Sequence, residues 1–318
     1  MNNPYSSFAG SRVIITGSAG FIGSALVDWL LEAGAHVIGI DIRQGCDKVG
    51  YEHLMGDASR LSVDDLRRLR PDYLFHLASI VGVVEASSDP AATRHAILGM
   101  TEQFVEMVAE VEGVRFVYVS SSEVYGQADD FPIVETTPLS PLSAYGQAKR
   151  DAETVVLRAC ADDRLDGVVV RPFNVYGPGQ RADFVTSRFI ELALGDDDLT
   201  LVGGGDQVRT FTYIDDFVDG LLRAAVHTGS QRVFNVAGPE TASIAELASI
   251  IVDESGSRAS VVSVETETLG RPSDIEVRDR IASCDAARRE LAYAPSIGIR
   301  EGVSRMISHR RRGELVTR

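Results

Sequence analysis

The chain of 318 residues has few cysteines, a deficit of positive charge and no long apolar run, and each shortage excludes a class of protein. Its three cysteines are Cys46, Cys160 and Cys284. They lie far apart and form no C-x-x-C motif, which argues against a disulfide framework and against a zinc site. A formal net charge of −15 argues against nucleic acid or an anionic membrane surface as the main partner. The sequence also lacks a stretch of about 18 apolar residues and a secretory signal pattern, so we expect a soluble, cytoplasmic protein without metal or membrane partners.

What the sequence does contain is the composition of an ordinary globular protein. Hydrophobic residues make up 44% of the chain and charged residues 24%, and no internal repeat or low-complexity tract occurs. A chain of this length can bury a large core without disulfides or metals. Its length also leaves room for two domains.

The most informative stretch is at residues 13–23. A β-branched run is followed by three glycines with the spacing G-x-x-G-x-x-G, and an apolar helical pattern follows at once. In a strand–turn–helix unit of this kind, Gly17 can take the turn, Gly20 lets the backbone approach a pyrophosphate, and Gly23 lets the helix pack on the strand. Phe21 and Ile22 stand at the helix N-terminus, where free N–H groups and the positive end of the dipole face the phosphates. The stretch predicts a dinucleotide site.

The next strand pattern, at residues 36–40, ends at an acidic residue. Asp41 lies 18 residues after Gly23, where a carboxylate can bond the adenosine ribose hydroxyls. Because it would repel a 2′-phosphate, Asp41 favours NAD over NADP, although Arg43 could weaken that preference.

Two further strand ends complete the predicted cofactor site. Asp57 and Ala58 follow the third strand and could flank the adenine. The fourth strand, at residues 73–77, ends in residues that suit a backbone passing close to a cofactor: Leu77, Ala78 and Ser79. We interpret His76 as a core histidine and not as a catalyst.

Strand and helix patterns alternate through the first half of the chain, with further strands predicted at 115–119 and 168–171 and helices near 63–70, 91–111 and from 144. The alternation predicts an α/β fold with a Rossmann-type, doubly wound parallel sheet, whose ligands lie at the carboxyl ends of the strands. The second half is more mixed, with helices predicted near 184–194, 214–227, 244–252 and 298–309 and strands at 199–202, 209–213, 232–235 and 261–264. We expect an NAD-binding domain over 1–172 and a smaller mixed α/β domain over 173–318, with the chain crossing back around 207–240.

Catalytic chemistry is predicted just after the strand at 115–119. Serines and a glutamate follow that strand directly, and Tyr145 and Lys149 stand at i and i+4 on one face of the next helix. A lysine beside a phenol stabilises the phenolate, which lowers the pKa of the phenol and makes tyrosine a usable base. Serine, tyrosine and lysine beside a nicotinamide are the groups needed to take a proton from an alcohol while its hydride leaves.

The chain resembles the extended short-chain dehydrogenase/reductases, in the branch of nucleotide-sugar epimerases and dehydratases. The resemblance runs from about residue 11 to 308 and rests on motifs at residues 16–23, 76–79, 120–126, 145–149, 171–178, 205–211 and 270–274. It implies an NAD cofactor, a UDP- or dTDP-linked sugar as substrate, and a homodimer.

The resemblance also implies roles for individual residues. Tyr145 is the base at the sugar C4 hydroxyl, Lys149 holds the cofactor ribose and tunes the phenol, and Ser121 is the hydroxyl partner. The nucleotide diphosphate is bound by Asn174, Arg209 and Arg271, and Asp274 lies near the nucleoside. The second domain would therefore bind the nucleotide sugar.

The reaction after C4 oxidation stays open among several types. A 4-epimerase needs no further group and is our leading prediction, whereas a 4,6-dehydratase needs a C5 base, for which Glu123 is the candidate. Ser122 then stands where those dehydratases have a carboxylic acid and is a poor replacement for it. The residues around Glu123 also resemble the 5,6-dehydratases and, less closely, the decarboxylases of nucleotide glucuronates. A non-catalytic NAD-binding sensor and an NADPH-consuming reductase are the alternatives of other classes.

Overall fold

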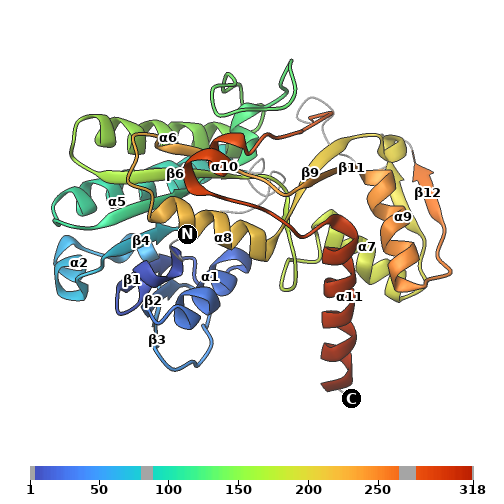
Figure 1. Cartoon of the computed structure of the whole chain (residues 1–318), viewed down its shortest axis with the longest axis horizontal. Coiled ribbons are helices and arrows are strands. Elements are labelled where there is room, and N and C mark those ends of the chain that lie inside the picture. Colours follow the sequence, from blue (N-terminus) through green and yellow to red (C-terminus); the bar gives the residue numbers. More distant parts are fainter. Residues whose placement is uncertain (1–3, 80–88, 265–276, 317–318) are drawn as a thin grey trace.

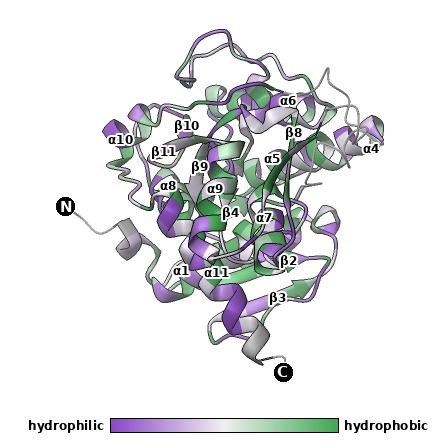
Figure 2. Ribbon diagram, turned by 90° about the vertical axis from the view of Figure 1, so that its right-hand side faces the viewer, coloured by the Kyte–Doolittle hydropathy of each residue, from purple (hydrophilic) through white to green (hydrophobic). Residues whose placement is uncertain are grey.

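The structure, a computed structural model, describes residues 4–79, 89–264 and 277–316. Figure 1 shows a larger unit built on a twisted sheet, and a smaller unit that carries the C-terminal helix. Hydrophobic segments gather in the strands of the central sheet, while α11 (Ile299–Val316) contains a strongly hydrophilic stretch (Figure 2). Within the described part, we find no helix with the length and apolar character that a membrane crossing requires.

The larger unit contains a seven-stranded, fully parallel sheet with the strand order β10-β6-β5-β4-β1-β2-β3. Its strands are β1 (Arg12–Thr16), β2 (His36–Asp41), β3 (Tyr51–Met55), β4 (Tyr73–His76), β5 (Arg115–Val119), β6 (Asp166–Pro172) and β10 (Val233–Val236). The central strands are apolar along their length and buried on both faces, as expected for a parallel sheet covered by helices on each side.

Helices cover both faces of this sheet because successive side chains of each strand point to opposite sides. Val13 and Ile15 belong to one buried cluster and Ile14 to the other. The first cluster includes α1 (Phe21–Glu32) and α8 (Ile214–Ala225), and the second includes α2 (Val63–Leu69), α5 (Met100–Ala109) and α6 (Ala144–Ala161). The predicted doubly wound α/β fold is confirmed.

The strand order reverses beside β1, which pairs with β2 on one side and with β4 on the other. The turns that follow β1 and β4 meet there: Leu77 N donates to Thr16 O at 3.2 Å, and Ala78 N donates to Thr16 Oγ1 at 3.1 Å. A crevice at the carboxyl ends of the strands where the order reverses is the usual ligand site of such sheets.

The smaller unit is formed by two short sheets and three helices. Its sheets have the orders β11-β9-β7 and β12-β8. The elements are β7 (Val175–Tyr176), α7 (Val185–Leu194), β8 (Leu199–Val202), β9 (Val208–Tyr213), β11 (Glu240–Ser243), α9 (Ile244–Ser255), β12 (Val261–Val264) and α11 (Ile299–Val316). Between β9 and β11 the chain returns to the larger unit as α8 and β10.

The structure differs from the predicted elements in three places. The helix expected at 91–111 consists of α4 (Pro90–Arg94), a π-helical turn at 95–99 and α5. The sequence analysis missed α10 (Asp285–Leu291), which is short and mostly polar. It also missed β7 and β11, because two residues carry no pattern of their own and β11 is largely exposed and polar.

Candidate active site

The glycine loop after β1 closes against the end of β4. Gly17 has a φ of +75°, and a Cβ on it would lie 2.9 Å from the Ala78 nitrogen. A Cβ on Gly23 would lie 2.1 Å from the Gly17 carbonyl oxygen. Side chains at these positions would therefore force the turn, the first helix and β4 apart, which explains two of the three glycines.

The acidic residue at the end of β2 ties this loop to the sheet. Asp41 is buried and accepts hydrogen bonds from Ala19 N and Arg43 N, both at 2.9 Å. The Arg43 guanidinium in turn donates to Ala19 O at 2.6 Å. Asp41 thus shapes the glycine loop, a role that the sequence did not predict.

These residues fit a dinucleotide. The N-terminus of α1, which contains Phe21 and Ile22, has no side-chain cap, so its first N–H groups remain available for phosphate. At the end of β5 the hydroxyl of Ser120 is buried and has no hydrogen-bond partner in the part of the chain that the structure describes.

The other predicted cofactor residues follow the ends of β3 and β4. Asp57 accepts a hydrogen bond from Ser59 N at 2.9 Å. The hydrogen bonds from the backbone and side chain of Ser59 lower the pKa of the Asp57 carboxyl. Ala58 is buried, and Leu77, Ala78 and Ser79 follow β4.

His76 behaves as the core histidine that the sequence analysis expected. Its Nδ1 lies 2.9 Å from Thr16 Oγ1, and its ring packs between aromatic residues. Burial, with a smaller contribution from the charge of Lys149, lowers the pKa of His76 to about 3. The ring is therefore neutral at physiological pH.

Three of the predicted catalytic residues come together at the end of β5 and the first turns of α6. The Ser121 side chain is near enough to the Tyr145 phenol to lower its pKa, and the Ser121 oxygen accepts from Glu123 N at 3.1 Å. The Lys149 ammonium donates to Val119 O at 2.9 Å and lies 5.9 Å from the centre of the Tyr145 ring. The capping of α6 by Ser143, which accepts from Gly146 N at 3.0 Å, fixes where the helix begins.

The pKa of the phenol differs from the expectation. Burial raises the pKa of Tyr145 to about 12, and the hydrogen bond from Ser121 only partly opposes this. Burial also lowers the pKa of Lys149 to about 7. The lysine points its ammonium at a backbone carbonyl, so in this structure desolvation outweighs the stabilisation of phenolate that we predicted from the i, i+4 spacing.

Glu123 and Ser122 lie in a short 3₁₀ turn, η4 (Ser122–Tyr125), directly after Ser121. Ser122 is buried. Glu123 forms an ion pair with Arg280, a residue that the sequence analysis did not identify. Arg280 belongs to the charged stretch 278–280, which has the pattern of a solvated loop. Arg280 reaches the site because its segment pairs with β9, and the local sequence contains no pattern that predicts this pairing.

Two predicted substrate residues have side chains that bond to the backbone. Asn174 has a φ of +37° and donates to Thr210 O at 3.0 Å. Arg209 donates to the carbonyl oxygens of Val277 and Arg278 at 2.6 and 2.7 Å. These hydrogen bonds connect Asn174 to β9 and β9 to residues 277–278, so both side chains hold neighbouring segments of the predicted site together. Arg271 and Asp274 lie outside the described residues.

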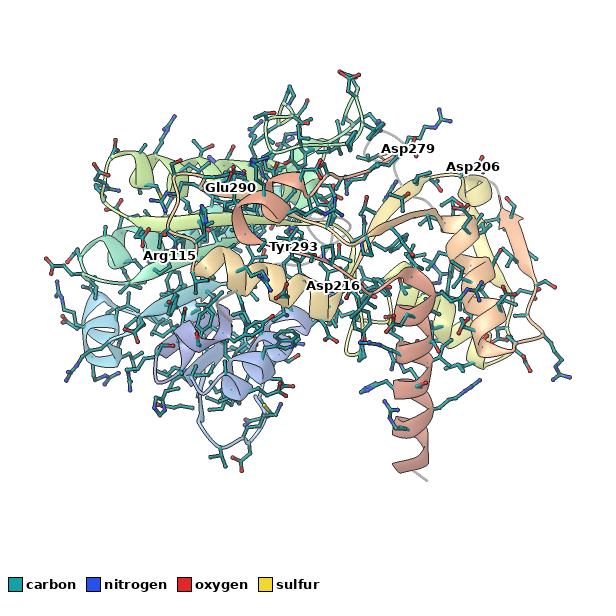
Figure 3. All side chains as sticks on the ribbon, in the orientation of Figure 1. Arg115, Asp206, Asp216, Asp279, Glu290 and Tyr293 are labelled. Carbon is teal, nitrogen blue, oxygen red and sulfur yellow. The ribbon has the colours of Figure 1, made fainter. Side chains whose placement is uncertain are left out.

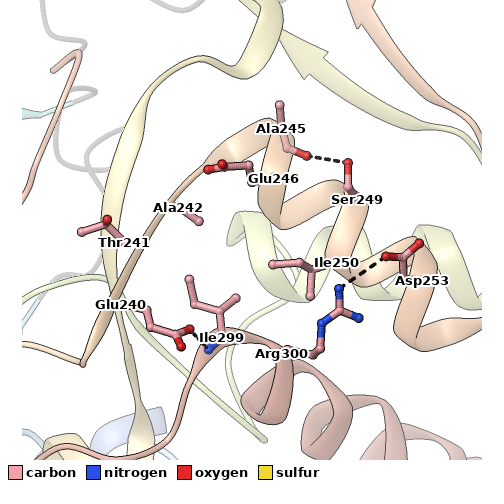
Figure 4. A pocket seen from close by; sticks show the side chains of 10 residues that line it. All are labelled: Glu240, Thr241, Ala242, Ala245, Glu246, Ser249, Ile250, Asp253, Ile299 and Arg300. Atoms are coloured by element: carbon pink, nitrogen blue, oxygen red, sulfur yellow. Dashed lines mark hydrogen bonds and ion pairs between the residues drawn. The ribbon is translucent and has the colours of Figure 1, made fainter.

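A separate hollow of about 570 Å³ lies between β11, α9 and the start of α11 (Figure 4). Its polar groups are engaged with the protein itself: Glu240 accepts from Ile299 N at 2.7 Å, and Arg300 pairs with Asp253. None of the predicted site residues lines it.

The model of the NAD dependent epimerase/dehydratase family matches residues 13–237, and the chain belongs to that family. It is 33% identical over 317 residues to the uncharacterized UDP-glucose epimerase YtcB of Bacillus subtilis, with 94% of this chain and 97% of that protein covered. It is 31% identical over 308 residues to UDP-glucuronic acid decarboxylase 1 of Arabidopsis thaliana, with 93% of this chain and 69% of that protein covered.

A solved structure supports the same assignment. UDP-glucuronic acid 4-epimerase from Bacillus cereus, in complex with UDP-glucuronic acid and NAD, matches with a TM-score of 0.86 at 28% identity, with 95% of this chain and 99% of that chain covered. The predicted family, the NAD cofactor and the enzyme class are confirmed: the protein is an NAD-dependent epimerase/dehydratase of nucleotide sugars.

Proposed function

We propose that this enzyme interconverts the C4 epimers of a UDP-linked hexose through a transient 4-keto sugar. The observation that carries the proposal is the cluster of Ser121, Tyr145 and Lys149 next to the glycine loop at the carboxyl ends of the strands. NAD, when bound, supplies the hydride acceptor. Net epimerisation needs no protein group beyond this cluster, because the keto sugar only has to present its other face before it is reduced again.

In this proposal each residue of the cluster acts on the C4 oxygen or on its neighbours. Tyr145 takes the proton of the C4 hydroxyl and later returns it. Ser121, whose side chain is close enough to lower the pKa of the phenol, holds the same oxygen in place. Lys149 holds the cofactor ribose, and its ammonium lies 5.9 Å from the centre of the Tyr145 ring, where it can attract a developing phenolate.

A second candidate function is elimination or decarboxylation at C5, and Glu123 is the observation that favours it. Glu123 lies beside Ser121 and Tyr145, where a carboxylate could remove the C5 proton that a C4 ketone makes acidic. The neighbouring Ser122 offers no acid for the departing hydroxyl at neutral pH. One matched relative is a UDP-glucuronic acid decarboxylase.

We further propose that residues 173–318 mainly bind the nucleotide sugar, and residues 1–172 the NAD. Asn174 and Arg209, together with Arg271 and Asp274, are then the candidates for contacting the nucleotide part of the substrate. A dTDP-linked substrate, a cytoplasmic location and a homodimer remain predictions of the sequence analysis.

The test is to incubate the protein in deuterated water, without added reductant, with UDP- and dTDP-linked hexoses, hexuronates and N-acetylhexosamines. Products are read by mass spectrometry and proton NMR. An unchanged mass with an inverted C4 and no deuterium at C5 supports epimerisation. Loss of 18 or 44 mass units would replace it with dehydration or decarboxylation, and Glu123→Gln should then abolish the loss of 18. Retained NAD with no conversion of any sugar would favour the sensor.

A further inference from the structure

Arg280 is a buried cation at this site to which the proposed reaction gives no role. Its backbone pairs with β9, since Arg280 N donates to Val208 O at 2.9 Å and Thr210 N donates to Arg280 O at 3.0 Å. The neighbouring Asp279 accepts from Val208 N at 2.9 Å and fixes this register (Figure 3). The side chain is held inside the protein, and only 5% of the residue is exposed.

The guanidinium of Arg280 is only half satisfied. Its Nη1 donates to the carboxylate of Glu123. Its Nε and Nη2 are buried, and among the residues described here neither has a hydrogen-bond partner. Buried N–H groups of a charged side chain are strongly unfavourable without an acceptor, so two such atoms on one guanidinium call for an acceptor beyond the described residues, and a bound ligand can supply it.

The two unsatisfied atoms lie on the same edge of the guanidinium. This edge is the fork that holds a carboxylate through two parallel hydrogen bonds. The protein uses the same pair of atoms elsewhere: Arg171 Nε and Nη2 donate to the two oxygens of Glu153 at 2.9 and 2.6 Å. In Arg171 the fork is filled by Glu153, whereas no residue that the structure describes fills the fork of Arg280.

The open fork lies at the reacting end of the site. Arg280 contacts Glu123, whose backbone nitrogen donates to Ser121, and the Ser121 side chain lowers the pKa of the Tyr145 phenol. With the C4 oxygen of a substrate at Tyr145, we expect the sugar carbons next to C4 to face Arg280. In a hexuronate the carboxylate is attached to C5, the carbon next to C4.

We infer that the Nε–Nη2 fork of Arg280 binds the C6 carboxylate of a UDP-hexuronate and that Arg280 determines the specificity for this substrate class. The inference rests on the proposed function, because it takes Tyr145 as the group at C4. Two carboxylates then share one guanidinium on different edges, Glu123 at Nη1 and the substrate at the fork. Arg280 supplies a local positive charge in a chain whose net charge is −15.

The test measures equilibrium binding of UDP-glucuronate, UDP-glucose and UDP to the NAD-loaded protein by calorimetry. The wild type should bind UDP-glucuronate at least about tenfold tighter than UDP-glucose. Arg280→Lys keeps the charge but removes the fork, so it should lower this preference about tenfold or more and leave the affinity for UDP unchanged. Arg278→Lys is the matched control, because Arg278 lies on the same segment and is exposed; it should change none of the three affinities.

Two results would overturn the inference. The first is equal binding of UDP-glucuronate and UDP-glucose by the wild type. The second is that Arg280→Lys loses as much affinity for UDP as for UDP-glucuronate, which would assign the fork to the diphosphate. If Arg280→Lys fails to fold or loses NAD, the inference is tested by the affinity of the wild type for UDP-glucuronamide. The amide removes only the charge of the carboxylate, so it should bind at least about tenfold more weakly than the acid. Failure of the proposed function gives another result, because the UDP-sugar would then bind to the protein without being converted at C4.

Discussion

At the scale of single residues, burial controls the chemistry of the site more than charge does. The phenol of Tyr145 and the ammonium of Lys149 are both desolvated, and each pKa is moved in the direction that disfavours the charged form. The sequence predicted the members of this cluster through the Tyr-x-x-x-Lys spacing. It could not predict their protonation, which depends on the surrounding atoms, including the Val119 carbonyl that receives the ammonium.

Removing the phenol hydroxyl should abolish turnover while leaving binding intact. For Tyr145→Phe we expect a fall in kcat of about 10²–10⁴, because proton transfer by a positioned side chain contributes about that much. The UDP-sugar affinity should change little. Tyr73→Phe, at the amino end of β4, is the control and should keep full activity. A Tyr145→Phe enzyme with near-normal turnover would remove tyrosine from the reaction.

The buried His76 should make the protein less stable in acid. The pKa of His76, about 3, lies below the usual 6.5, so between these pH values the unfolded chain binds a proton at His76 and the folded protein does not. Stability from this group is therefore lost as the pH falls below about 6.5, by about 2 kcal/mol between pH 7 and pH 5. His76→Asn should flatten this part of the curve of unfolding free energy against pH. His36→Gln, which changes an exposed histidine, should leave the slope as it is.

At the scale of elements, the site is held by the junction between α6 and β6. Arg171 on β6 and Glu153 on α6 form a bidentate pair in which both side chains are almost fully buried. Tyr125 joins them, since its hydroxyl accepts from Arg171 Nη1 at 2.7 Å and donates to Asn235 Oδ1 at the same distance. Because α6 also carries Tyr145 and Lys149, this junction fixes the catalytic face of the helix relative to the sheet.

Breaking this pair from one side should be costly. We expect Glu153→Leu and Arg171→Met each to destabilise the protein by about 3–5 kcal/mol, because each leaves an unpaired buried charge. The double variant should cost much less than the sum of the two, and chemical denaturation measures the coupling. The exposed pair of Arg164 and Glu106 is the control, with an expected coupling below about 1 kcal/mol. Additive effects at Arg171 and Glu153 would contradict a shared role.

The same scale shows where prediction from sequence succeeds. The strands of the central sheet are strongly patterned, and the glycines that follow β1 are required by contacts with Ala78 and with the loop itself. The strand–turn–helix geometry of the glycine loop could therefore be predicted from the sequence. Arg280 could not, because a bridge to β9 decides its position and the residues around it are charged like any exposed loop.

At the scale of the whole molecule, the predicted site draws residues from both units. Asp216 of α8 shows how the units are joined, since its carboxylate accepts from the backbone nitrogens of Ser296 and Ile297 just before α11 (Figure 3). The carboxyl ends of the parallel strands carry the glycine loop and Ser121, and α6 carries Tyr145 and Lys149. The segment beside β9 supplies Arg280, which bonds to Glu123 across the site. The alternating sequence pattern predicted the first contribution, while the second arises only from tertiary pairing.

The central claim, that the sugar is oxidised at C4 and reduced again at the same carbon, is tested most directly with substrates that carry deuterium on C4. UDP-glucose and UDP-glucuronate labelled in this way are incubated with the protein in ordinary water, and the products are analysed by NMR. We predict the C4 epimer with the deuterium still on C4, because the hydride is removed and returned without exchange with water. An epimer whose C4 deuterium has been replaced by solvent hydrogen would contradict the account.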